Sequence, residues 1–305
     1  MENGAARISE IAAHPQPVRP QPRTMALALM RLAARAPLAM LHAIGVVLGW
    51  IAYCSKAYRR DLRRNLALAG YERDARVRRA AVGEAGKMVA EAPKILLDAR
   101  GKTLALVRAF DGREHIDRAR AAGKGIVYLT PHFGCFEIVG QAIAELGPLT
   151  ALYRPTKIAW LRPAIEQGRV GGPNRRVAPA DLRGVRILLG ALKRGEAIIV
   201  LPDQVPGRGE GVWAEFFGKP AYTMTLAARL AERQDSVCLI VTGERLPRGA
   251  GFALHVRPLP AALPGESAAR RINRALEDAI RARPEQYLWG YNRYKRPRGA
   301  EPPGA

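Results

Sequence analysis

Short runs of wholly apolar residues, each ended by proline or glycine, constrain the fold of this chain most strongly. Residues 125–129 (GIVYL) lead into Thr130-Pro131, and residues 197–201 (AIIVL) lead into Pro202. Runs of this length and composition predict strands that are buried on both faces. Shorter or weaker strand patterns cover residues 149–152, 237–242 and 252–256.

Amphipathic stretches separate these runs, and their apolar residues recur at helical spacing. They predict helices over residues 72–97, 136–146, 182–193 and 266–283, with Gly195 ending the third as a helix C-cap. Alternating helices and fully apolar strands are typical of α/β proteins. The sequence therefore predicts a mostly parallel central sheet flanked by helices.

The loop after residues 125–129 carries the strongest chemical signal. Its sequence, TPHFGCFE, places His132 just beyond the strand and Glu137 five residues later. On one continuous helix these side chains would point roughly 140° apart. They converge only if His132 lies in the loop and Glu137 in the first turn of the following helix.

A carboxylate in that place can hold one imidazole nitrogen and leave the other free to accept a proton. We therefore expect His132 to be a general base and Glu137 its partner. A histidine that merely satisfies a hydrogen bond at the strand end is the plainer alternative. Cys135 as a nucleophile is a further alternative, although no neighbour in the sequence would lower its pKa.

Other kinds of site find little support. The remaining histidines show no ligand spacing with His132, so no metal is expected. The chain lacks the glycine-rich phosphate-binding motifs, and we expect no cofactor. Its three cysteines, Cys54, Cys135 and Cys238, form no CxxC pair and suit a reducing compartment.

The first 66 residues differ from the rest. Residues 1–24 are rich in proline and alanine and are expected to be a disordered tail. Residues 25–66 are interpreted as a membrane-associated helical segment, because residues 37–54 carry no formal charge and a basic stretch follows them. The apolar stretch is at the lower limit for a span, so it either crosses the bilayer or lies in its interface. A buried core helix with a solvated basic flank is the alternative.

The net charge of +22 predicts an anionic partner. Nucleic acid is disfavoured, because aromatic residues are few and no known nucleic-acid motif is present. A membrane surface, an acidic protein or an acidic substrate remains. Arg270, Arg271, Arg274 and Arg281 on the last predicted helix are candidates for contact with such a partner.

Several blocks, in order, resemble the late lipid A acyltransferases of Gram-negative bacteria, within the superfamily that carries a His-x4-Asp/Glu motif. The similarity runs from about residue 25 to residue 297. Its blocks are YRR with NLAL (residues 58–68), HFG with Glu137, YRP (153–155), LPDQ (201–204), FFGKPA (216–221) with Thr223, and PEQYLW (284–289). Cys135 and Phe136 depart from the Asn-Trp pair often found inside the first motif.

The resemblance implies a glycerolipid acyltransferase-like fold with an N-terminal membrane helix, a catalytic domain over residues 67–297 and a C-terminal tail over residues 298–305. It also implies direct attack by a hydroxyl of a lipid A precursor, an anionic glycolipid, on an acyl carrier protein thioester. This would take place on the cytoplasmic face of the bacterial inner membrane. By the same resemblance His132 is the base, Glu137 is its partner, and substrate contacts fall to Arg169, Asp203, Tyr153, Arg154 and Gln204. Another lipid acceptor, such as a lysophospholipid or an aminolipid, and a non-catalytic basic membrane-binding protein are the alternatives.

Overall fold

A seven-stranded sheet forms the centre of the molecule. The computed structural model describes residues 25–97, 102–153, 165–166, 168–169, 172–207 and 209–303. Within this part the strand order is β1-β9-β8-β2-β5-β3-β4. The bounds are β1 Val107–Asp111, β2 Gly125–Leu129, β3 Leu149–Tyr153, β4 Arg175–Pro179, β5 Ala197–Val200, β8 Ser236–Arg245 and β9 Phe252–Pro258.

Five neighbouring strands, from β8 through β2, β5 and β3 to β4, run parallel. Strand β9 is antiparallel to β8, and β1 is parallel to β9. The reversal follows from the short connection between β8 and β9, which contains only one 3-10 turn (Pro247–Gly249), too short for a crossover. The prediction of a mostly parallel sheet flanked by helices is confirmed.

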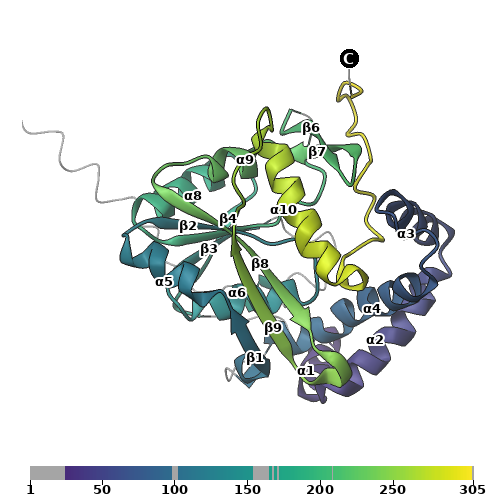
Figure 1. The fold of residues 1–305 in the computed structure, drawn as a ribbon. Helices are drawn as coiled ribbons and strands as arrows, with labels where there is room; N and C mark the ends of the chain where they lie inside the picture. Colours follow the sequence, from purple (N-terminus) through teal and green to yellow (C-terminus); the bar gives the residue numbers. More distant parts are fainter. Residues whose placement is uncertain are drawn as a thin grey trace, which may run out of the picture.

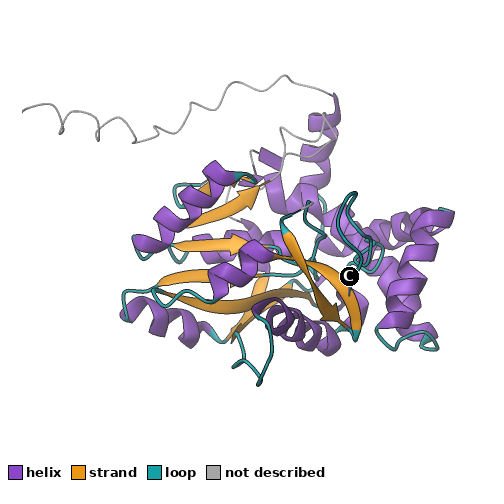
Figure 2. Ribbon diagram, turned by 90° about the horizontal axis from the view of Figure 1, so that it is seen from above, coloured by secondary structure: helices purple, strands orange, loops and turns teal. Residues whose placement is uncertain are grey.

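Helices cover both faces of the sheet (Figures 1 and 2). Helices α5 (Arg113–Ala121) and α6 (Phe136–Ala144) pack into one apolar core, and α8 (Leu182–Lys193), α9 (Thr225–Ala231) and α10 (Ala268–Ala282) pack into the other. Every residue of β2 and of β5 is buried, as expected for strands covered on both sides.

Local sequence signals explain where α8 begins and ends. The Asp181 side chain accepts a hydrogen bond from the backbone N–H of Gly184, which is the usual arrangement of an N-cap. Gly195 follows the last turn with φ of +73°, a left-handed conformation that favours glycine. The predicted C-terminal role of Gly195 is confirmed.

Four helices precede the sheet: α1 (Met25–Arg35), α2 (Leu38–Tyr53), α3 (Lys56–Leu68) and α4 (Ala75–Leu97). The apolar stretch forms α2 and the basic stretch forms α3. Among the described helices, none alone meets the length and hydropathy expected of a membrane span; α2 and α3 meet them together, but with a bend of 101° between them. The predicted disordered tail, residues 1–24, lies outside the described residues.

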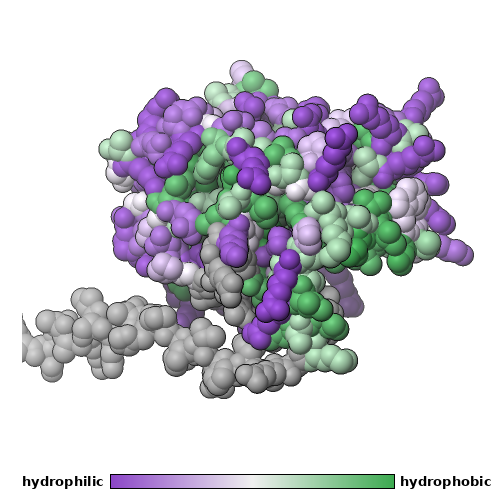
Figure 3. All heavy atoms as spheres, turned by 90° about the horizontal axis from the view of Figure 1, so that it is seen from below, coloured by the Kyte–Doolittle hydropathy of each residue, from purple (hydrophilic) through white to green (hydrophobic). Residues whose placement is uncertain are grey.

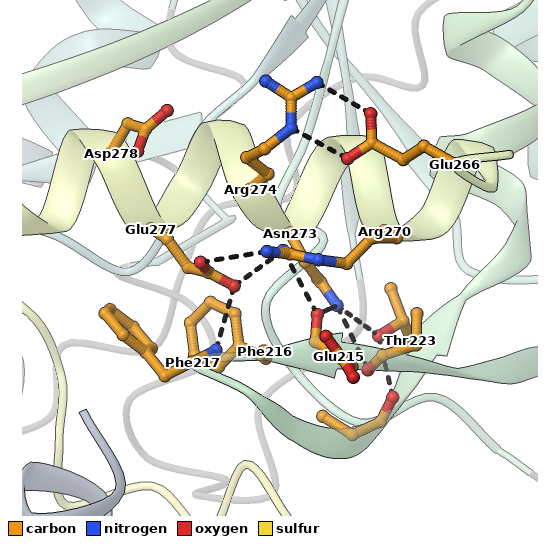
Figure 4. A network of polar contacts seen from close by, with 12 residues as sticks. Glu215, Phe216, Phe217, Thr223, Glu266, Arg270, Asn273, Arg274, Glu277 and Asp278 are labelled. Carbon is orange, nitrogen blue, oxygen red and sulfur yellow. Dashed lines mark hydrogen bonds and ion pairs between the residues drawn. The ribbon is translucent and has the colours of Figure 1, made fainter. Parts of the chain in front are cut away.

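Helix α10 is fastened to a two-stranded hairpin that the sequence did not reveal as strands, β6 (Gly211–Phe216) and β7 (Lys219–Met224). Asn273 donates hydrogen bonds to the carbonyl of Glu215 and to the hydroxyl of Thr223 (Figure 4). Glu277 accepts a hydrogen bond from the backbone N–H of Phe217 at 2.9 Å. The hairpin follows the loop that carries Asp203, so this network helps to hold that region of the molecule.

The same network changes the interpretation of the arginines on α10. Arg270 and Arg281 form ion pairs with the buried carboxylate of Glu277, and Arg274 forms one with Glu266. The fourth arginine, Arg271, donates to the carbonyl of Pro260. These side chains are partnered within the chain, so they are poor candidates for the docking of an acidic partner.

Candidate active site

The carboxyl ends of β2 and β5 bring the site together. The two strands are adjacent and parallel, with Leu129 opposite Val200. His132 lies three residues beyond the end of β2, and Asp203 lies three residues beyond the end of β5. Ligand and catalytic groups of open α/β sheets gather at this edge.

The imidazole of His132 is held at both nitrogens. Nδ1 lies 2.8 Å from Oδ1 of Asp203, and the backbone N–H of His132 donates to Oδ2 of the same carboxylate at 2.8 Å. The side-chain amide of Gln204 lies 3.1 Å from Nε2. With Asp203 ionised, Nδ1 carries the proton and donates it to the carboxylate. Nε2 is then an acceptor, and the amide N–H of Gln204 donates to it.

Asp203 is fully buried, and burial alone would raise the pKa of its carboxyl group. The His132 side chain and backbone N–H, together with the nearby charge of Arg293, more than offset that effect, so the pKa lies below its ordinary value. The pKa of the nearby Tyr287 hydroxyl is in turn raised by burial and by the Asp203 carboxylate. Asp203 is therefore an ionised acceptor for both donors of His132.

Glu137 does not orient the imidazole, contrary to our expectation from the spacing. It lies in the first turn of α6, as predicted, but its carboxylate forms a bidentate ion pair with Arg169, whose Nε lies 3.3 Å from Oε2. The reason is topological. Asp203 reaches Nδ1 from a neighbouring strand end, whereas Glu137 faces a guanidinium that stacks over the ring of Tyr153 at 5.3 Å.

The backbone of the His132 loop is paired with the segment after α10. The N–H of Gly134 donates to the carbonyl of Gln286, and the N–H of Leu288 donates to the carbonyl of His132. Gly134 has φ of +51°, and a Cβ there would lie 2.0 Å from the carbonyl oxygen of Gly243. A side chain at Gly134 would therefore displace the loop that carries the histidine.

A buried charge cluster supports the loop from behind. Arg245, on β8, donates to the carbonyl of Gly134 and forms ion pairs with Glu91 and Glu84 of α4. Burial of Glu91 opposes its charge, but Arg245 and His42 more than offset this and lower its pKa. Removing one partner of such a buried pair typically destabilises a protein by about 3–5 kcal/mol. The cluster thus connects the His132 loop to the N-terminal helices.

Cys135 is buried beside this cluster. Burial raises the pKa of its thiol well above the ordinary value, and the charge of Glu91 adds to the effect. A thiol in this state is a poor nucleophile. The site therefore favours His132 over the cysteine alternative.

His132 lines a cavity of about 770 Å³. Polar groups line it near His132: Glu137, Arg169 and Gln204. Apolar side chains of α8 and α9 also line the cavity: Leu182, Val185, Leu189, Leu226 and Leu230. Further charged side chains line it as well: Arg175, Arg176, Asp181, Glu210, Arg229 and Arg233. A cavity lined by both charged and apolar side chains suits an amphipathic ligand.

The structure brings together most of the residues expected at the site. His132, Glu137, Arg169 and Gln204 line one cavity, Asp203 binds the imidazole of His132, and Tyr153 contributes the ring beneath Arg169. Arg154 lies outside the described residues.

Two supporting residues, Arg245 and Tyr287, were not expected. Tyr287 belongs to the PEQYLW block, which contributed to the family resemblance, but the sequence assigned no role to this tyrosine. Arg245 had no signal in the sequence.

The model of the family described as bacterial lipid A biosynthesis acyltransferase matches residues 20–296. The chain belongs to this family. It is 29% identical to the lipid A biosynthesis palmitoleoyltransferase of Escherichia coli (strain K12) over 188 residues. This alignment covers 61% of this chain and 60% of the relative. It is 30% identical over 196 residues to the lipid A biosynthesis lauroyltransferase of the same organism, 62% of each chain. A lipid A biosynthesis acyltransferase of Haemophilus influenzae is 28% identical over 185 residues, 59% of this chain and 57% of the relative.

These alignments span about three fifths of the length of the relatives. The family assignment agrees with the resemblance noted in the sequence.

Proposed function

We propose that this protein transfers a fatty acyl chain from an acyl carrier protein thioester to a hydroxyl group of a lipid A precursor, at the cytoplasmic face of the bacterial inner membrane. The observation that carries the proposal is the imidazole of His132, with Nδ1 bound to Asp203 and Nε2 available as a proton acceptor beside the cavity. Family membership supports the class of reaction and the type of acceptor.

In the proposed reaction the acceptor hydroxyl replaces the amide of Gln204 as the donor to Nε2. Nε2 removes the hydroxyl proton as the oxygen forms a bond to the thioester carbonyl carbon. The carbon–sulfur bond then breaks, and the imidazolium returns the proton to the leaving thiolate. Asp203 stabilises the imidazolium while it carries the charge, and no acyl-enzyme forms.

Arg169 and Glu137 have a different part in this proposal. Arg169 lines the cavity and supplies positive charge for a phosphate of the glycolipid or for the carbonyl oxygen of the thioester. Glu137 holds the guanidinium in place through two contacts. We therefore propose that Glu137 positions Arg169 and not His132. Tyr153 packs against the same guanidinium.

We assign the fatty acyl chain to the apolar part of the cavity. Leu182, Val185 and Leu189 recur at helical spacing along the side of α8 that faces the cavity, and Leu226 and Leu230 do so along α9. These side chains line the same cavity as His132, so an acyl chain bound against them would lie near the imidazole.

The net charge also favours the proposed substrates. A phosphorylated glycolipid and an acidic carrier protein both carry negative charge, and a chain with net charge of +22 attracts both. Since three arginines of α10 are paired with acids of the same helix region, this attraction must come from other basic residues, such as those of α3.

We predict that His132→Ala lowers the rate of acyl transfer by at least about 10²-fold, because the general base is lost. The measurement is mass spectrometry of the lipid product, with purified protein, an acyl carrier donor and a lipid A precursor or a lysophospholipid as acceptor. Circular dichroism controls for folding. Near-normal turnover by this variant would exclude the base role, and acylation of the lysophospholipid alone would replace the proposed acceptor. A wild-type protein that transfers to neither acceptor would leave only a binding function.

A second pair of variants separates the two carboxylates. Asp203→Asn keeps the shape but offers one acceptor oxygen where the backbone N–H and Nδ1–H of His132 need two. We expect its kcat to fall by at least about 10²-fold. Glu137→Gln leaves His132 untouched and weakens the hold on Arg169, so we expect mainly a higher KM for the acceptor. If Glu137→Gln lowers kcat as much as Asp203→Asn does, with KM unchanged, the assignment of roles is reversed.

The assignment of the acyl channel predicts a change in chain-length preference. Leu189→Trp adds bulk inside the channel and should shift preference toward shorter acyl chains, by about tenfold or more relative to the wild-type donor. Ile187→Trp, on the same helix but outside the cavity, is the matched control. Relative turnover across a series of donors measures the shift, and an unchanged preference in Leu189→Trp would place the chain elsewhere.

A further inference from the structure

Helix α2 has two different faces. Its buried residues, Leu38, Leu41, His42, Gly45 and Gly49, follow one helical stripe. The opposite face exposes large apolar side chains, and α1 continues it. The members of this apolar face are Met25, Leu29, Leu32, Met40, Ile44, Val47, Leu48, Trp50 and Ile51, each 39–81% exposed. Figure 3 shows hydrophobic side chains gathered over this part of the molecule.

The buried stripe contacts the backbone of α4 directly. A Cβ at Gly86 of α4 would lie 1.8 Å from the carbonyl oxygen of Gly45, and a Cβ at Gly49 would lie 2.0 Å from that of Val82. Contacts this close join α2 to the catalytic body as one packed unit.

Polar interactions hold the two ends and the middle of α2. Lys94 donates to the carbonyls of Ala34 and Ala36, just before the helix begins. In the middle, Nε2 of His42 lies 2.9 Å from the carboxylate of Glu91. At the C-terminal end, Arg63 donates to the hydroxyl of Tyr53 at 2.9 Å.

These contacts determine how α2 can meet a bilayer. Glu91 belongs to the ionised cluster with Arg245 and Glu84, directly behind the buried stripe. If α2 crossed the hydrocarbon core, this cluster and α4 would have to enter with it, and each charge at bilayer depth costs several kcal/mol. The apolar face can enter a leaflet without moving any of them.

Basic residues flank α2 at both ends. Helix α2 itself has no charged residue. Arg31 and Arg35 precede it, and the first half of α3 carries Lys56, Arg59 and Arg60. An apolar face with a basic border fits the interface of an anionic bilayer, where each basic side chain adds about 1 kcal/mol of attraction.

We infer that α1 and α2 form an in-plane docking surface for an anionic lipid leaflet, with both ends of α2 on the same side of the membrane. This inference rests on the proposed membrane attachment and specifies its geometry. The active site is then held at a fixed height above the leaflet, because the cluster behind α2 also holds the catalytic loop through Gly134.

Cysteine labelling tests the topology in the full-length protein. Native Cys54, which is exposed, reports on the C-terminal end of α2. Arg35→Cys in a Cys54→Ser background reports on the other end. Each is treated with a membrane-impermeant maleimide in right-side-out spheroplasts, with detergent-solubilised protein as the reactivity control. We expect both to be protected from the outside. Labelling of either reporter from the outside would show that α2 crosses the bilayer and would overturn the inference.

Vesicle sedimentation tests the surface itself. The double variant Ile44→Asp with Val47→Asp should bind phosphatidylglycerol vesicles roughly tenfold or more weakly than wild type, since two apolar side chains no longer enter the leaflet. Leu263→Asp, an exposed leucine elsewhere that is 55% accessible, is the matched control and should bind normally. Added salt should weaken wild-type binding.

Unchanged vesicle binding by the double variant would contradict the inference. If the only effect of the double variant were to convert a dimer into a monomer, the apolar face would be a protein–protein interface, and this would also contradict the inference. Acyl transfer measured in detergent micelles keeps this test separate from the proposed reaction. The double variant should retain transfer there, whereas His132→Ala should lose transfer and still bind vesicles.

Discussion

The contact between Asp203 and His132 is the interaction on which the rest of the site depends. It joins the ends of two adjacent parallel strands, and the carboxylate accepts from both the imidazole and the backbone N–H of the same histidine. One buried charge thereby fixes the position of the loop, the orientation of the ring and the nitrogen that carries the proton. The His132 contacts and the nearby charge of Arg293 keep that carboxylate ionised in a buried place.

A second buried charge, Arg245, extends this arrangement to the rest of the molecule. Its guanidinium contacts the catalytic loop at Gly134 and the α4 carboxylates at Glu84 and Glu91, while His42 of α2 completes the cluster. The loop that carries His132, the helix that bears the apolar face and the helix between them are thus held by one set of charges. The proposed membrane surface and the proposed base therefore belong to one packed unit.

Local patterns predicted the architecture well, because burial on both faces leaves an unbroken apolar run in β2 and β5 and helical spacing marks α4, α6, α8 and α10. The place of His132 at a strand end followed from the same patterns. The partner of His132 was predicted wrongly, because spacing along the chain favoured Glu137, whereas adjacency in the sheet decides the contact and brings Asp203 from 71 residues away. The ion pairs of the α10 arginines were not predicted, since their acid partners are recognisable only once the helix is packed.

Nitrogen-15 NMR of the His132 imidazole tests the central claim most directly. In protein labelled at histidine, with His132→Gln used to assign the signal, spectra recorded where the ring is neutral should show the tautomer protonated at Nδ1, with Nε2 as the unprotonated nitrogen. Asp203→Asn should disturb this pattern, and Glu137→Gln should leave it unchanged. A ring protonated at Nε2 in the wild type, or a pattern sensitive to Glu137 and indifferent to Asp203, would contradict the account.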